Sequence, residues 1–235
     1  SNRYLIILNT KDSSQLFFEN IKEYCDELEH ELLYLSTNLT PCHRREKLER
    51  IKNQENKKFI VVTTQLVEAG VDLSSDVCYR DLAPVDSLVQ SAGRCNRDKE
   101  LGDFGGRMSI IELCQDKESK SFCEWVYGSR LIERTRVALR NTSPKDSRDF
   151  FALSREYFRL CINEEGETKE AKEELLDLIF KQEFGTLVKG GRKQDGSEIL
   201  PFRLIENTYP KISVFVLNME NEKLLEEYVG LYNLR

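Results

Sequence analysis

The sequence predicts an α/β fold: a parallel β-sheet with helices on both faces, followed by a mostly helical extension with a short β element. Short, wholly apolar runs recur through the first part of the chain, as expected of strands buried on both faces. Segments whose apolar residues recur at helical spacing separate these runs. Strands and helices that alternate in this way are typical of a parallel sheet covered on both sides.

Five segments are predicted to be strands, and the third is rich in the β-branched residues that favour this conformation. They are residues 4–8, 32–35, 59–62, 77–80 and 108–113. Helices are predicted for residues 13–28, 41–51 and 86–97. Pro41 suits the first turn of the second helix, and Asp86 is expected to cap the third.

Polar pairs follow the first three predicted strands. They are Asn9-Thr10, Ser36-Thr37 and Thr63-Thr64. Each pair offers hydroxyl or amide groups to a ligand. Because ligands bind beyond the carboxyl ends of the strands in open α/β sheets, we expect the three pairs to lie along one rim.

The character of the sequence changes after residue 113. Ser143 and Pro144 suit the N-cap and first turn of a helix that continues to residue 158. The other predicted elements are helices at residues 122–139, 168–184 and 222–231 and strands at residues 202–205 and 212–217. We therefore expect two domains, residues 1–115 and residues 116–235, the second leading towards an accessory C-terminal region.

Composition excludes several classes of protein. Hydrophobic residues make up 40% of the 235 residues, but no apolar run approaches the roughly 18 residues that a membrane-spanning helix needs. The seven cysteines include no C-x-x-C pair, and with only two histidines we expect no metal site. Scattered thiols and the lack of an export signal favour the cytoplasm, without membrane association.

Charge is distributed unevenly along the chain. The net charge is −6, whereas proteins that bind nucleic acid without specificity are usually basic. Residues 43–58 contain seven Lys or Arg and three Glu, a local charge of +4, and residues 164–183 contain eight acids and three Lys, a local charge of −5. A basic strip on an acidic body fits a single directed nucleic-acid track.

The pattern Q-x-x-G-R-x-x-R is formed by Gln90, Gly93, Arg94 and Arg97 on the third predicted helix. Arginines three residues apart on a helix project from the same face. Their guanidinium groups suit the charge that develops on a phosphoryl group in its transition state. An isolated R-x-x-R is more often a solvated face. The glycine, which permits close approach of another surface, and the upstream segment of residues 62–73 favour phosphate chemistry here.

These two segments resemble motifs V and VI of superfamily 2 helicases. In that family the second RecA-like lobe supplies the motifs across a cleft to ATP held by the first lobe. The resemblance implies that Arg97 is the arginine finger and that Arg94 and Gln90 accompany it near the γ-phosphate. It also implies that Gly70 and Asp72 lie near the ribose and the catalytic water.

A second resemblance is more specific. Residues 35–45 resemble the Leu-Ser-Thr…His-Arg segment of the CRISPR-associated helicase-nuclease of type I systems, and residues 81–90 are similar to that family's lead-in to motif VI. The motifs cover residues 4–97. Ser91 departs from the pattern, since many members carry arginine there, which removes a charge near the cleft but leaves both finger positions intact.

The resemblance implies contacts with the backbone of a single DNA strand. The residues concerned are Ser36, Thr37, Arg44, Thr63 and Thr64. Contacts of this kind bind without reading sequence. Basic residues at a helix N-terminus oppose the helix dipole, so the placement of Arg44 and Arg45 is easier to understand if an anion binds there. His43 is interpreted as either a capping or a packing residue.

The ATP-binding motifs of a first lobe are missing from this sequence. No G-x-x-x-x-G-K-[ST] occurs, and no D-E-x-[HD] follows an apolar strand. We therefore expect ATP and its Mg²⁺ to be held by the first lobe, and this chain alone to bind ATP poorly and hydrolyse none.

Three hypotheses remain open. The leading one is the second motor lobe of a type I CRISPR helicase, whose implied partners are a first RecA-like lobe, a nuclease domain, single-stranded DNA and an RNA-guided surveillance complex. The second is the same lobe from another superfamily 2 DNA or RNA helicase. The third is a RecA-like protein-interaction domain without enzymatic activity. This hypothesis gains support if Gln90, Arg94 and Arg97 are buried in internal salt bridges.

Overall fold

The computed structural model describes residues 3–27, 29–52, 58–68, 71–102, 105–115, 120–162, 177–192, 196, 198–199 and 201–202. The chain divides into two compact units, Ser1–Glu164 and Glu165–Arg235, which are described separately.

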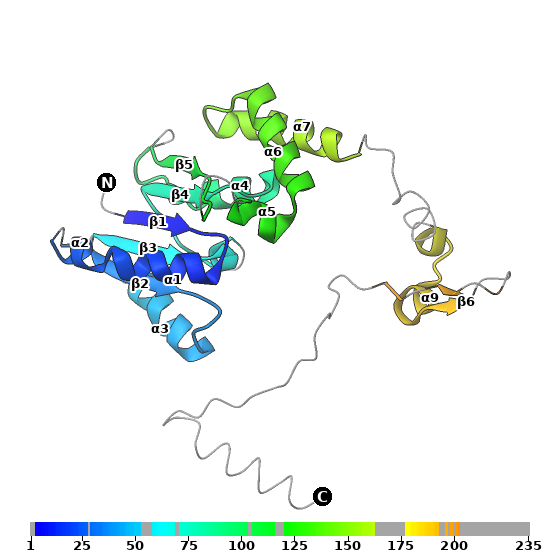
Figure 1. Ribbon diagram of the computed structural model, residues 1–235, viewed down its shortest axis with the longest axis horizontal. Helices are drawn as coiled ribbons and strands as arrows, with labels where there is room; N and C mark the ends of the chain where they lie inside the picture. Colours follow the sequence, from blue (N-terminus) through cyan, green and yellow to red (C-terminus); the bar gives the residue numbers. More distant parts are fainter. Residues whose placement is uncertain are drawn as a thin grey trace, which may run out of the picture. The chain divides into compact units, whose positions relative to one another are not determined.

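A five-stranded sheet in the order β2-β3-β1-β4-β5 forms the centre of the first unit (Figure 1). Its strands are β1 (Arg3–Ile7), β2 (Glu31–Leu35), β3 (Phe59–Thr63), β4 (Val77–Asp81) and β5 (Arg107–Ile111). All four pairings between neighbouring strands are parallel. The predicted parallel sheet and its five strands are confirmed, with small shifts at the strand ends.

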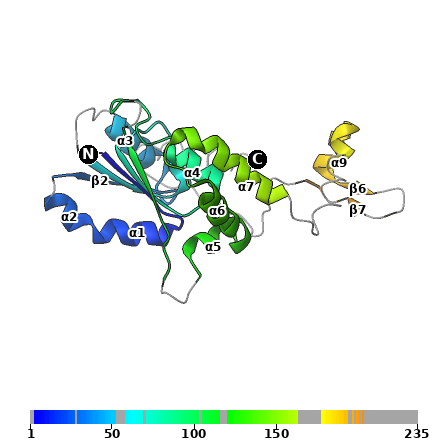
Figure 2. The same ribbon diagram turned by 90° about the horizontal axis from the view of Figure 1, so that it is seen from above.

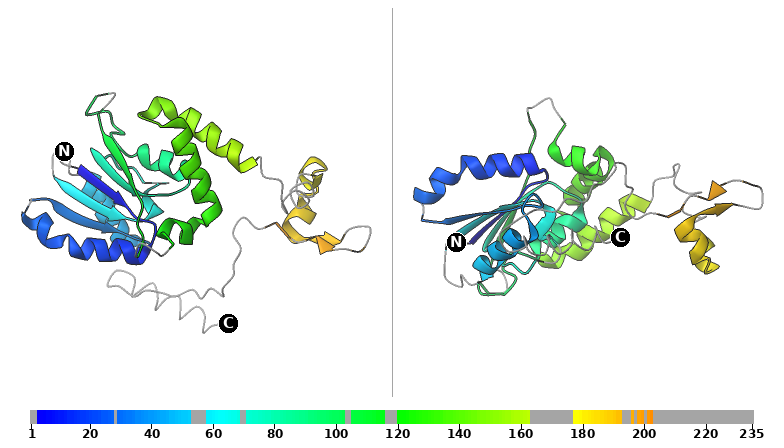
Figure 3. Two further views of the ribbon diagram at one scale, coloured as in Figure 1. Left: turned by 45° about the horizontal axis from the view of Figure 1, so that its top comes forward. Right: turned by 90° about the horizontal axis from the view of Figure 1, so that it is seen from below.

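Helices cover both faces of the sheet, as Figures 2 and 3 show. The helices α1 (Lys11–Asn20) and α2 (Lys22–Glu27) lie on one face, and α3 (Pro41–Lys52) and α4 (Val85–Ala92) on the other. Alternate residues of β1 serve the two faces, because Ile6 packs with Phe17 of α1 whereas Leu5 and Ile7 share a cluster with Ile51 of α3. The apolar runs are thus explained by burial on both sides.

Two predicted helices differ from the observed ones. The helix predicted for residues 13–28 is divided into α1 and α2 at Ile21, which caps α1. The helix predicted for residues 86–97 begins at Val85 after Pro84, so Asp86 lies in its first turn and is not the cap. It also ends at Ala92, because Gly93 is its C-cap.

As a result, Arg94 and Arg97 do not share a helix face, and this part of the prediction is wrong. They lie in a turn that begins with hydrogen bonds from Arg94 N to Ser91 O and from Cys95 N to Ala92 O. The chain then returns to the sheet, where Cys95 bridges to Ser75 just before β4. This long-range pairing competes with continuation of the helix.

Three further helices complete the first unit: α5 (Phe122–Tyr127), α6 (Ser129–Thr142) and α7 (Phe150–Ile162). Gly128, with a φ of 83°, divides the helix predicted for residues 122–139. The helix start predicted at Ser143 and Pro144 is wrong, since Ser143 is the left-handed C-cap of α6. Asp146 provides the actual start through a capping box with Asp149, in the 3₁₀ turn η2 (Ser147–Asp149) that leads into α7.

These helices extend the core of the sheet unit. Leu82 and Leu88 cluster with Ile132 of α6, and Val85 clusters with Ala138 and Leu153. Compactness therefore places α5 to α7 with the sheet, while a functional boundary after residue 115 stays a prediction.

The second unit contains the helix α9 (Phe184–Lys189) and a hairpin of β6 (Gly191–Arg192) and β7 (Glu198–Ile199). This hairpin does not coincide with the strands predicted at residues 202–205 and 212–217. The acidic helix predicted at residues 168–184 is described only from residue 177, and residues 177–180 are helical. Apart from Phe202, which is not in a strand, the strands predicted at residues 202–205 and 212–217 and the helix predicted at residues 222–231 lie outside the described residues. Among the residues described, no helix is both long and apolar enough to cross a membrane.

Candidate functional site

The expected rim exists at the carboxyl ends of β1, β2 and β3, where the three polar pairs follow their strands in adjacent positions of the sheet. Its side chains differ in access to solvent. Ser36 and Thr63 have no exposed surface, and Thr64 is buried, whereas Thr37 is exposed. The Ser36 hydroxyl accepts a hydrogen bond from Asn38 N (3.2 Å), and the Thr63 hydroxyl donates to Thr64 O (3.2 Å). The buried hydroxyls therefore shape the rim.

Basic side chains lie at the start of α3, beside the end of β2. The helix begins at Pro41, and Thr40 accepts the backbone hydrogen bond of Arg44 (3.0 Å). Arg44 is half-buried, and Arg45 and His43 are exposed. Within the described residues neither arginine forms an ion pair, in contrast to Arg50 farther along the helix, which pairs with Glu31. This helix start thus keeps positive charge available for an anion.

Arg94 binds the segment that follows β3. Its Nε donates to Val67 O (2.9 Å) and its Nη2 to Glu68 O (2.7 Å). Both acceptors are backbone carbonyls, and the arginine is half-buried. Arg94 therefore holds the segment that follows β3 in place. Gly70, in the same segment, lies outside the described residues.

Arg97 lies at the surface beside Asp72. Its Nη1 is 3.4 Å from Asp72 Oδ1, and the two side chains are 40% and 66% exposed. An exposed pair at this distance is weak and exchanges readily for another partner. Gln90 is exposed as well. The side chains of Gln90, Arg94 and Arg97 are therefore not buried in internal salt bridges. Such burial would have favoured the hypothesis of a protein-interaction domain.

The turn that carries Arg97 is held from two sides. Asn96, at a φ of 51°, donates from Nδ2 to Gly102 O (2.6 Å) and accepts from Leu101 N (3.0 Å). Ser75 N donates to Arg94 O (2.9 Å), and Asn96 N donates to Ser75 O (2.7 Å). Arg97 is therefore displayed by a fixed turn rather than by a helix.

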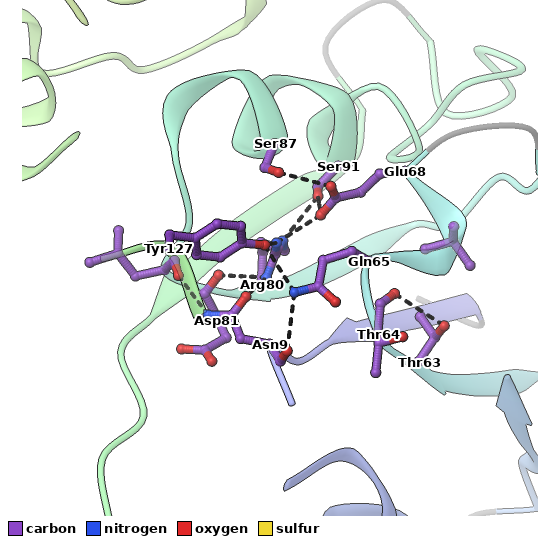
Figure 4. Close-up of polar contacts among 12 residues, drawn as sticks. Asn9, Thr63, Thr64, Gln65, Glu68, Arg80, Asp81, Ser87, Ser91 and Tyr127 are labelled. Carbon is purple, nitrogen blue, oxygen red and sulfur yellow. Dashed lines mark hydrogen bonds and ion pairs between the residues drawn. The ribbon is translucent and has the colours of Figure 1, made fainter. Parts of the chain in front are cut away.

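A buried arginine that sequence reasoning missed connects the rim with α4 (Figure 4). Arg80 of β4 has no exposed surface. It donates to Asn9 Oδ1 (2.7 Å), Glu68 Oε1 (2.7 Å), Ser91 Oγ (3.2 Å) and Tyr127 OH (3.1 Å). We call these five residues the Arg80 network. A charged residue in an otherwise buried strand was the available signal, because a buried charge requires partners.

Neighbouring side chains complete the network. Ser87 of α4 donates to the second carboxylate oxygen of Glu68 (2.8 Å). Gln65 Nε2 donates both to Asn9 O (3.1 Å) and to Tyr127 OH (2.9 Å). Ser91, the position that departs from the family pattern, is buried against the Arg80 guanidinium. A positive charge therefore lies beside the position where many family members carry arginine, but here Arg80 of β4 provides it.

Asp81, at the end of β4, is another buried ionisable group. Its Oδ1 accepts from Leu113 N (3.2 Å), and its Oδ2 has no hydrogen-bond partner among the described residues. Burial raises the pKa of this carboxyl above its ordinary value. Within the described part of the chain, no group of three or more His, Cys, Asp or Glu side chains is arranged to hold a metal ion.

Comparison with known proteins adds an independent observation. Residues 1–100 match the family model of the CRISPR-associated nuclease/helicase Cas3, C-terminal region. A CRISPR-associated nuclease/helicase Cas3 of Haloferax volcanii is 48% identical over 60 residues, which are 26% of this chain and 6% of that relative. The match includes the motif segments on which the resemblance was inferred. This confirms the resemblance inferred from the motifs.

Solved Cas3 structures share the fold. The T. fusca Cas3-ATP structure superposes with a TM-score of 0.59 at 23% identity, covering 77% of this chain and 23% of that one. A chain of the CRISPR RNA-guided surveillance complex, pre-nicking, gives a TM-score of 0.55 at 22% identity, covering 77% of this chain and 24% of that one. This chain thus spans about a quarter of these Cas3-type structures.

Proposed function

We propose that this chain is the second motor lobe of a Cas3-type, ATP-driven DNA helicase of type I CRISPR interference. In this proposal it supplies Arg97 as the arginine finger to a nucleotide held by a first lobe. The observation that carries the proposal is the exposed Arg97 guanidinium, displayed on a fixed turn and paired only weakly with Asp72.

The geometry suits a finger that acts across an interface. A phosphate has a higher charge than a carboxylate and replaces Asp72 at little cost, because the existing pair is exposed and long. The rigid turn fixes the guanidinium before the lobes close, so little reorganisation is needed when charge develops on the phosphoryl group. ATP, when bound, supplies the γ-phosphoryl group that is transferred to water, and its Mg²⁺ is held by the first lobe.

Arg94, Gln90, Gly70 and Asp72 support this face in the proposal. Arg94 donates two of its five N–H groups to the carbonyls of Val67 and Glu68, and the other three can donate to the nucleotide. Gln90 is exposed on α4 and is available at the same interface. Asp72, released from Arg97, is available near the ribose.

The nucleic-acid track is proposed to follow the rim and the start of α3. Exposed Thr37 and half-buried Arg44 contact phosphates, while Ser36, Thr63 and Thr64 shape the rim from within. Contacts to the sugar-phosphate backbone allow movement along any sequence. The names of the similar Cas3 proteins support two further partners, a nuclease domain and an RNA-guided surveillance complex.

Replacement of the finger tests the proposal. In the complete two-lobe enzyme, we expect Arg97→Ala to lower DNA-stimulated ATP hydrolysis by about 10³–10⁵-fold, the contribution typical of an arginine finger. Arg155→Ala, which removes an exposed arginine from α7, is the matched control and should hydrolyse ATP normally. Steady-state phosphate release with saturating single-stranded DNA measures the effect, and Arg97→Lys tests whether charge without the planar fork is sufficient.

Normal hydrolysis by Arg97→Ala would exclude the finger assignment. Unwinding assays with the unmodified two-lobe enzyme separate the leading hypothesis from another superfamily 2 helicase. Unwinding of DNA but not of RNA supports the Cas3-type function, and preference for RNA contradicts it.

A further inference from the structure

Glu68 contacts both the Arg80 network, which reaches the rim, and Arg94, which precedes the turn that carries Arg97. Its carboxylate accepts from Arg80 (2.7 Å) and Ser87 (2.8 Å), and its backbone carbonyl accepts from Arg94 (2.7 Å). The Glu68 side chain is 9% exposed and that of Arg80 is fully buried. A movement of Glu68 therefore reaches Arg94, and with it the turn that carries Arg97.

The opposite side of the network is the rim. Arg80 Nη1 donates to Asn9 Oδ1, and Asn9 Nδ2 donates to Leu82 O (2.7 Å) at the start of the connection to α4. Asn9 precedes Thr10, whose hydroxyl caps α1 by accepting from Ser13 N (3.0 Å). Gln65, which follows Thr64 directly, donates to Asn9 O. Through Asn9 and the hydrogen bond that Asn9 accepts from Gln65, the Arg80 network thus contacts the ends of β1 and β3 on the rim.

Stability alone does not account for this arrangement. A buried ion pair loses its hydration, and apolar side chains of similar size are often as stabilising. The guanidinium instead fixes directions, because its planar donors reach four other elements at once. An element held at several points moves together with its partners.

We propose that Arg80 and Glu68 are positioning residues that couple binding of single-stranded DNA at the rim to binding of ATP at the Arg97 face. The inference rests on the proposed function. In the absence of this network, each ligand still binds, but neither strengthens the binding of the other.

The test measures coupling in the complete two-lobe enzyme. The double variant Arg80→Met/Glu68→Gln removes both charges at similar volume and leaves no buried charge without a partner. Single-stranded DNA affinity is measured by fluorescence anisotropy with and without a non-hydrolysable ATP analogue. We expect the ratio of the two affinities, typically about 5–150-fold for coupled sites, to fall to near unity, while DNA affinity without nucleotide is unchanged. Reciprocity requires the same loss in the effect of DNA on analogue binding.

A milder variant covers failure of the double variant to fold. Tyr127→Phe removes only the hydroxyl that accepts from Gln65 and Arg80 and should lower the coupling ratio partially. Its matched control is Tyr34→Phe, a half-buried tyrosine whose hydroxyl lies 3.1 Å from Ser14 Oγ, outside the network.

The outcomes separate this inference from the proposed function. If Arg97→Ala abolishes hydrolysis while both network variants keep the full coupling ratio, the coupling inference is wrong and the helicase proposal stands. If Arg97→Ala hydrolyses ATP normally, the helicase proposal itself fails. A loss of coupling in Tyr34→Phe as large as in Tyr127→Phe would show a general structural effect and overturn the inference.

Discussion

Arg80 is the largest fully buried side chain among the described residues, and its guanidinium donates hydrogen bonds to four side chains from other segments. Another titratable group of the same strand is also buried. Cys78, two positions earlier, has no exposed surface, and burial raises the pKa of its thiol to about 12. At the scale of single residues, β4 thus combines a buried thiol, Cys78, with a buried guanidinium, Arg80, that has several hydrogen-bond partners.

The protection of Cys78 can be measured. Because only the thiolate reacts, we expect a short iodoacetamide pulse at about pH 8 to label exposed Cys114 and to leave Cys78 unmodified until denaturant is added. The unfolded thiol releases its proton near its ordinary pKa of 9.0, before the folded one does. Stability is therefore expected to decrease as the pH rises from 9.0 towards 12. Peptide mass spectrometry reads the labelling, and equal labelling of both cysteines would contradict the expectation.

Element boundaries decide what the motifs present. The end of α4 at Ala92 moves Arg94 and Arg97 from a helix face into a turn, where one binds carbonyls and the other remains exposed. The break between α5 and α6 at Gly128 allows Tyr127 to reach Gln65 and Arg80 while α6 packs elsewhere. In both cases a glycine ends an element next to a residue with long-range contacts.

Gly128 is expected to be essential for its backbone conformation. It adopts φ 83° and ψ 142°, a region that residues with a side chain rarely enter, although a Cβ there would meet no atom within 4 Å. We therefore expect Gly128→Ala to lower the free energy of unfolding by about 1–3 kcal/mol through backbone strain alone. Urea unfolding followed by circular dichroism measures this, and an unchanged midpoint would show that the break tolerates other conformations.

The whole first unit extends beyond the sheet, because α5 to α7 cover apolar side chains of α4 and of the end of β4. Leu88 packs near Cys123 and Ile132, and Val85 packs near Ala138 and Leu153. A Val, Leu or Ile side chain contributes roughly 1.5–3 kcal/mol when it is removed from water. The compact unit therefore ends near Glu164.

Truncation tests this boundary. We expect residues 1–164 to fold alone with a cooperative thermal transition, and residues 1–115 to aggregate or remain unfolded because the apolar side of α4 is uncovered. Size-exclusion chromatography and circular dichroism compare the two. A stable, monomeric fragment of residues 1–115 would instead support a domain boundary at the position predicted from the sequence.

Local patterns in the sequence determined the five strands, their parallel arrangement, the rim at their carboxyl ends and the Cas3-type motifs, because these depend on short-range periodicity and on residue type. The accessibility of the candidate residues and the Arg80 network were decided only by the tertiary structure. Arg80 and Asn9 are 71 positions apart, and Arg94 and Val67 are 27 apart. Contacts between such distant positions arise when packed elements bring them together, so no local pattern contains them.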